Sequence, residues 1–255
     1  MFDTLVAPIL NYSAEIWGYH KSPDVESVHS KFCRKLLCVR NSTNLDAIYG
    51  ELGRTPMYIY RKLIIIKYWL KLLKQKDTSL LFKTYLMLKT DVDNGNTYNQ
   101  NNWAFQVKCI LDQVGLTYMW QNQFNMLINY NIIKQRIIDI YHQSWYAAIN
   151  YSPRLKTYCL FKHSFVFEPY LDKIQDKKYR IALTKFRTSS HDLFIEIGRH
   201  SNIPRPNRLC VQCSSNMIEN EYHHLIICSK YKDLRQKYLK KYYYTWPTLQ
   251  KFTNL

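Results

Sequence analysis

Hydrophobic residues recur along much of this chain at intervals of three and four, which is the spacing of one face of an α-helix. In one such stretch Val28, Phe32 and Leu36 share a face. Ser22 followed by Pro23 is typical of a helix start, because serine caps the free backbone amides and proline suits the first helical position. The pattern therefore predicts a helix that begins at Pro23.

Further helices are expected on both sides of Gly53. A short helix should end at this glycine, after which Thr55 would cap a longer helix opened by Pro56. The apolar face expected for that longer helix consists of Ile59, Leu63, Ile66, Leu70 and Leu73.

The same reasoning extends to the rest of the chain. We expect a helix at 78–88, a polar and asparagine-rich loop at 89–102, and a basic, tyrosine-rich helix at 229–246. The helix expected at 131–150 places four large side chains on one face: Ile133, Ile137, Tyr141 and Trp145. No stretch alternates as a strand would, so the fold class is predicted to be mostly α.

The texture of the sequence changes toward its end, where basic and aromatic residues interleave. We therefore predict a multi-helix body at 1–150 and a small basic module at 176–255. No run of about 18 apolar residues occurs, which predicts no membrane span. Asp3 stands where a secretory signal would be basic, so we expect an intracellular protein, in the nucleus, the cytoplasm or both.

The charge of the chain indicates the kind of partner that it binds. The chain carries a formal net charge of +17. Residues 1–151 hold 17 Lys and Arg against 11 Asp and Glu, whereas residues 152–255 hold 19 against 8, a net +11. So basic a region favours a polyanionic partner, and RNA or DNA is the commonest one. We expect no small-molecule substrate, since no glycine-rich phosphate loop is present.

The spacing of the cysteines predicts a metal site. Four of the seven cysteines are scattered, which suits a reducing compartment, while Cys210, Cys213 and Cys228 cluster. Cys-x2-Cys followed by histidine and cysteine predicts a structural Zn²⁺ site of the zinc-knuckle type, with four protein ligands and no open position for catalysis. His223 and His224 compete for the remaining place, and spacing alone leaves this open.

Basic side chains around this cluster are candidates for contact with phosphates, and the aromatic residues among them could stack on unpaired bases. The candidate nucleic-acid-binding residues are Arg187, Arg199, Arg205, Arg208, Lys230 and Arg235.

Several stretches together resemble the region that follows the polymerase domain in the open reading frame 2 proteins of LINE-type (non-LTR) retrotransposons. They begin at residues 7, 32, 178 and 208, and the resemblance runs from about residue 2 to residue 236. The matching motif positions are Arg208, Cys210, Cys213, Glu219, Glu221, His223, Cys228, Tyr231 and Arg235. The resemblance implies that His223 is the ligand and that the helical body adjoins the thumb of a polymerase.

The resemblance does not extend to catalysis. Reverse transcription needs carboxylates that hold two metal ions, normally including an adjacent Asp pair, and no Asp-Asp pair occurs in this sequence. We therefore expect a nucleic-acid-binding fragment without enzymatic activity. The alternatives are a zinc-stabilised protein-interaction module, an enzyme whose carboxylates gather only in the fold, and a transposon relic without activity.

Overall fold

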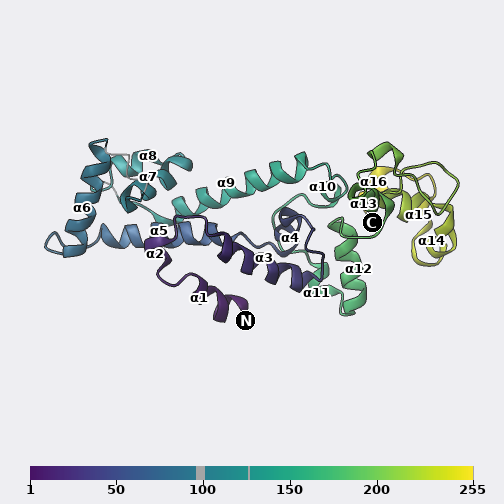
Figure 1. Cartoon of the computed structure of the whole chain (residues 1–255), viewed down its shortest axis with the longest axis horizontal. Helices are drawn as coiled ribbons and strands as arrows, with labels where there is room; N and C mark the ends of the chain where they lie inside the picture. Colours follow the sequence, from purple (N-terminus) through teal and green to yellow (C-terminus); the bar gives the residue numbers. More distant parts are fainter. Residues whose placement is uncertain (96–100, 126, 255) are drawn as a thin grey trace. The chain divides into compact units, whose positions relative to one another are not determined.

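The computed structural model of the chain describes residues 1–95, 101–125 and 127–254. Helices dominate these residues, and no β-strand occurs among them (Figure 1). One isolated antiparallel bridge joins Leu209 to Ile218. The predicted fold class, mostly α, is therefore confirmed for the described part of the chain.

The chain forms two compact units, neither of which is continuous in sequence. Residues 1–30 belong with 55–145, and residues 31–54 belong with 146–255. The expected division into two continuous domains stays a prediction. In the described residues, no helix is both long enough and apolar enough to cross a lipid bilayer.

The first unit contains most of the long helices. Its elements are η1 (Phe2–Val6), α1 (Ala7–Leu10), α2 (Ala14–Trp17), the start of α3 (Pro23–Leu37), α5 (Met57–Leu72), α6 (Leu80–Asp93), α7 (Trp103–Gln113), α8 (Thr117–Gln121) and most of α9 (Tyr130–Tyr151). The predicted start of α3 at Pro23 is confirmed. The expected loop at 89–102 is wrong at its beginning, because α6 continues to Asp93, and its residues 96–100 lie outside the described residues.

The start of α5 differs from the expectation. Thr55 does not cap this helix; Pro56 occupies the cap position without a side-chain hydrogen bond. The carboxylate of Glu26 in α3 accepts hydrogen bonds from the backbone amides of Met57 and Tyr58 at 3.0 and 2.7 Å. A residue distant in sequence thus satisfies the free amides of the first turn, which a local pattern cannot indicate.

The sequence predicted the buried face of α9 correctly, but it predicted that of α5 only in part. In α9 the four predicted residues are all buried, which confirms that face. In α5 the buried face is shifted, since Leu63, Leu70 and Leu73 are only half-buried. The buried residues of α5 are Met57, Ile59, Arg61, Ile65, Ile66, Trp69 and Leu72.

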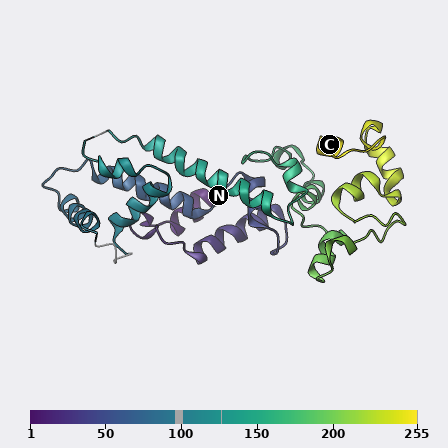
Figure 2. The same cartoon turned by 90° about the horizontal axis from the view of Figure 1, so that it is seen from above.

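The second unit consists mainly of short helices (Figures 1 and 2). Its elements are the end of α3, α4 (Leu45–Leu52), the last turn of α9, α10 (Tyr158–Phe161), α11 (Tyr170–Lys173), α12 (Lys177–Arg187), α13 (Phe194–His200), η2 (Arg205–Asn207), η3 (His223–Ile227), η4 (Ser229–Tyr231), α14 (Lys232–Tyr238), α15 (Lys241–Tyr244) and α16 (Leu249–Thr253). The single helix expected at 229–246 is wrong: extended backbone at Leu239, with φ −110° and ψ 144°, ends α14.

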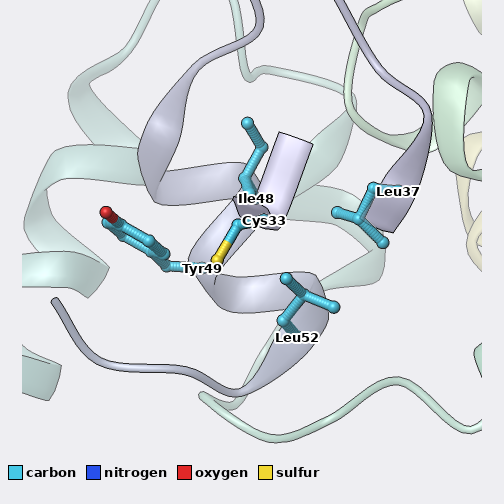
Figure 3. Close-up of a cluster of buried hydrophobic side chains, with 5 residues drawn as sticks. All are labelled: Cys33, Leu37, Ile48, Tyr49 and Leu52. Atoms are coloured by element: carbon cyan, nitrogen blue, oxygen red, sulfur yellow. The ribbon is translucent and has the colours of Figure 1, made fainter. Parts of the chain in front are cut away.

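Local sequence signals set both ends of α4. The Asn44 side chain caps its start, and Gly53 ends it with φ +57°, as predicted. A Cβ on Gly53 would lie 2.5 Å from the backbone nitrogen of Phe167, so only glycine fits. Figure 3 shows the apolar cluster that α4 forms with α3: Cys33, Leu37, Ile48, Tyr49 and Leu52.

A buried charge network lies on α4 as well. Glu51 is completely buried and accepts two hydrogen bonds of 3.0 Å from Arg187 of α12. Arg187 also lies 3.0 Å from Glu168, which in turn pairs with the buried ammonium group of Lys162. The Tyr170 hydroxyl donates to Glu51 at 2.6 Å. These paired charges join three segments that are far apart in sequence.

Replacing Glu51 with glutamine should destabilise the fold. The substitution keeps the side chain's shape but leaves Arg187 short of one buried partner, and breaking a buried pair costs about 3 kcal/mol. Urea denaturation of the Glu51→Gln variant should show this loss, and Asp233→Asn, at an exposed position of α14, serves as control. Equal stability of the two variants would contradict the structural importance of the network.

Candidate metal centre

A small hairpin positions the first two cysteines. The amide of Cys210 donates to the carbonyl of Met217 at 2.8 Å, and the amide of Glu219 donates to the carbonyl of Arg208 at 2.9 Å. These bonds close the turn that carries Cys213, whose sulfur lies within 4.8 Å of the Cys210 sulfur. The Gln212 amide lies 3.4 Å from the Cys210 sulfur and donates to it.

A single π-helical turn, η3, positions the other two side chains. The Cys228 amide donates to the carbonyl of His223 at 2.7 Å, an i to i+5 hydrogen bond. The amide of His223 is held in turn by the side-chain oxygen of Asn220 at 2.8 Å. An α-helix would not align residues five apart, whereas this wider turn brings His223 and Cys228 together.

The four side chains Cys210, Cys213, His223 and Cys228 converge on one point. One potential ligand atom from each lies within 4.8 Å of all the others. The sulfurs of Cys210 and Cys228 are 3.9 Å apart, and the Cys213 sulfur lies 3.4 Å from Nε2 of His223. Tetrahedral coordination at ordinary zinc bond lengths would separate two sulfurs by about 3.8 Å and a sulfur from a nitrogen by about 3.6 Å. This group could therefore bind a metal ion.

His224 lies outside this group. Its ring packs against that of Tyr231, with 4.4 Å between ring centroids, and burial lowers the pKa of its imidazole. Nε2 of His223 faces the thiols, while its buried Nδ1 has no hydrogen-bond partner among the described residues. Of the two histidines left open by spacing, the structure brings His223 to the three cysteines.

The thiols differ in their electrostatic surroundings. A hydrogen bond with the Ser215 hydroxyl, assisted by the Ser215 backbone, lowers the pKa of Cys213 to about 6. Burial raises the pKa of Cys228 to about 11. A bound metal ion ionises coordinating thiols outright, so binding would release the Cys228 proton and neutralise the buried negative charge.

Apolar packing contributes little to this segment. Within the described part of 201–254, the only buried apolar side chains besides Cys210 and Cys228 are Ile226 and Phe252. Four protein ligands would complete a tetrahedron and leave no position for a substrate or a reactive water. The chemistry that the arrangement supports is therefore structural, since metal binding would contribute folding free energy.

Polar side chains next to the four candidate ligands also hold this segment in place. Arg235 is buried and donates to the carbonyls of Leu225, Ile227 and Cys228 around η3. Glu219 accepts the backbone amide of Phe194 at the start of α13, at 3.0 Å. The sequence did not predict this contact between Glu219 and Phe194, because no short motif encodes a contact across 25 residues.

Glu221 has a similar role. Its carboxylate is 3% exposed and accepts hydrogen bonds from the hydroxyls of Thr157 and Ser189 at 2.8 and 3.2 Å. It also lies 2.9 Å from Nε2 of His191. Burial alone would raise the pKa of Glu221, but His191 and the Thr157 hydroxyl outweigh burial and hold the pKa below its ordinary value of 4.5.

The basic residues singled out by sequence occupy different environments. Arg187 and Arg235 lie inside the fold, paired with carboxylates and carbonyls respectively. Lys230 is exposed to solvent. Arg199, Arg205 and Arg208 line one hollow together. The role of all six in binding nucleic acid stays a prediction.

The two adjacent histidines provide a matched test of the metal centre. His223→Gln should lower the affinity for a divalent metal by about two orders of magnitude, because one of four ligands is lost. His224→Gln should leave metal affinity and stoichiometry unchanged. Metal content by mass spectrometry and titration with a chromophoric chelator measure both variants. Metal loss in His224→Gln with retention in His223→Gln would contradict the assignment.

Acid should weaken the contribution that the ionised carboxylate of Glu221 makes to the stability of the fold. Because its pKa is lowered in the fold, its charge stabilises the protein above pH 4.5, and this contribution is lost as the pH falls below that value. The stability difference between the unaltered protein and Glu221→Gln should therefore be largest near neutral pH and shrink below about pH 4.5. Chemical denaturation at several pH values tests this, and a difference that grows on acidification would contradict it.

Comparison with known proteins leaves the site to be interpreted on its own geometry. No family model matches the chain, and neither a curated protein nor a solved structure matches it.

Proposed function

We propose that the second unit is a zinc-stabilised module that binds RNA or single-stranded DNA. The observation that carries the proposal is the convergence of Cys210, Cys213, His223 and Cys228 within the most basic part of the chain. Three thiolates and one imidazole form a soft donor set that suits zinc, whereas calcium and magnesium prefer oxygen ligands.

The charge distribution supports nucleic acid as the partner. Residues 152–255 carry a net +11. Several of their carboxylates, such as Glu196, Glu219 and Glu221, are buried and already paired or hydrogen-bonded. Most lysines of α12 and α14 are exposed, so the charged side chains at these surfaces are mainly basic.

The sequence resemblance to the post-polymerase region of LINE-type retrotransposon proteins agrees with this proposal. In such a protein the module would help to hold template RNA and target DNA, without contributing catalytic carboxylates. The parent activity is not proposed for this chain.

Salt and chelation test the proposal together. The affinity for a labelled single-stranded oligonucleotide should fall steeply between about 50 mM and about 200 mM salt, because each phosphate contact displaces counterions. The purified protein should contain one zinc ion per chain, and removing it with a chelator should weaken binding. Affinity that is indifferent to salt, or binding that survives full metal removal, would contradict a zinc-dependent electrostatic module.

A further inference from the structure

A hollow of about 360 Å³ lies in the second unit, between the segment before α10 and the elements α13 and η2. We name it the arginine pocket. The charged side chains that line it are Arg154, Lys156, Arg199, Arg205, Arg208, Glu196 and Glu221. Five cations against two carboxylates leave a formal net charge of +3 in a space that could enclose one small anionic group.

Both carboxylates of the pocket are already occupied. Glu196 accepts from Arg199 at 3.1 Å and lies 3.2 Å from Nε of Arg154. Glu221 is held by His191 and Thr157. Glu196 therefore orients two of the pocket's arginines, and neither carboxylate contacts Lys156 or Arg205.

Arg205 is the arginine of the pocket that lacks a partner, whereas Arg154, Arg199 and Arg208 each have one. Its side chain makes no hydrogen bond or ion pair with any described residue, and its Nε is buried and unsatisfied. Leaving a buried charged donor unpaired is costly, so the arrangement is incomplete as a purely internal structure. Pro204 and Pro206 flank Arg205 and restrict the backbone on both sides of it.

The pocket is joined to the metal hairpin through Arg208. The guanidinium of Arg208 donates to the carbonyls of Ile203 and Ile195, both at 2.9 Å. Its own carbonyl accepts the Glu219 amide that closes the hairpin. Gly198 permits this crossing, because a Cβ there would lie 2.8 Å from Cγ of Arg208. Arg208 thus forms part of the wall of the arginine pocket, and its position depends on the hairpin that carries Cys210 and Cys213.

We propose that the arginine pocket binds one phosphate group of the nucleic acid, with Arg205 as the unpartnered donor and Lys156 and Arg199 supplying further positive charge. This inference rests on the proposed function and assigns it a specific contact. Guanidinium groups match the geometry of phosphate oxygens, and a concave site with a net positive charge suits a phosphate better than a neutral base.

The test compares two substitutions, each of which replaces one cationic side chain with glutamine and so removes one positive charge. Arg205→Gln should weaken binding of a single-stranded oligonucleotide by about tenfold, since a charge-assisted hydrogen bond is lost. It should also reduce the slope of log affinity against log salt by about 0.7. Lys232→Gln, at an exposed position of α14 outside the pocket, should change affinity by about twofold or less. Zinc content and circular dichroism establish that both variants are folded.

Two oligonucleotide forms identify the source of the phosphate. Loss of a preference for 5′-phosphorylated over 5′-hydroxyl oligonucleotide in Arg205→Gln would identify a terminal phosphate, whereas equal binding of both forms would identify an internal phosphodiester. Either assignment holds only if Arg205→Gln loses more affinity than Lys232→Gln. Inorganic pyrophosphate should compete with the oligonucleotide for the unaltered protein more strongly than for Arg205→Gln.

The outcomes separate this inference from the proposed function. Equal losses in Arg205→Gln and Lys232→Gln would overturn the pocket while leaving a diffuse electrostatic binder in place. Failure of the unaltered, zinc-loaded protein to bind any oligonucleotide would overturn the proposed function, and the pocket's assignment to nucleic acid with it.

Discussion

The constraint on which the basic segment depends is the meeting of three sulfurs and one imidazole nitrogen at a single point. Burial of apolar side chains stabilises α3 and α4, but the segment after α13 buries few of them. A cage of four ligands can replace such a core, because it fixes a hairpin and a π-helical turn relative to each other. Arg235 then satisfies the carbonyls that the tight chain path leaves exposed around η3. The local fold thus depends on the same residues that form the candidate metal site.

The distribution of carboxylates connects this cage to function. Glu51, Glu196, Glu219 and Glu221 are all buried, and each pairs with an arginine or accepts hydrogen bonds. Acidic groups therefore stabilise the inside of the second unit, while most of its lysines remain in solvent. The charged side chains that the second unit exposes are therefore mainly basic, as the proposed binding of nucleic acid requires. Arg205 extends this argument from a general field to one defined position.

Much of the local structure follows from the sequence. The helix face of Ile133, Ile137, Tyr141 and Trp145 and the end of α4 at Gly53 are visible as periodicity and as glycine chemistry. The four candidate metal ligands are visible as spacing, although spacing alone does not choose between His223 and His224. The amide-capping role of Glu26 and the pairing of Glu51 with Arg187 were missed, because both join residues far apart in sequence. The break in the helix expected at 229–246 was missed as well, since its basic and tyrosine-rich composition carries no strong stop signal before Leu239.

X-ray absorption at the zinc edge of the purified protein tests the central claim most directly. The account predicts one zinc ion per chain with three sulfur neighbours at about 2.3 Å and one nitrogen neighbour at about 2.0 Å. A first coordination shell made only of oxygen and nitrogen, or a folded protein that purifies without zinc and does not take it up, would contradict the account.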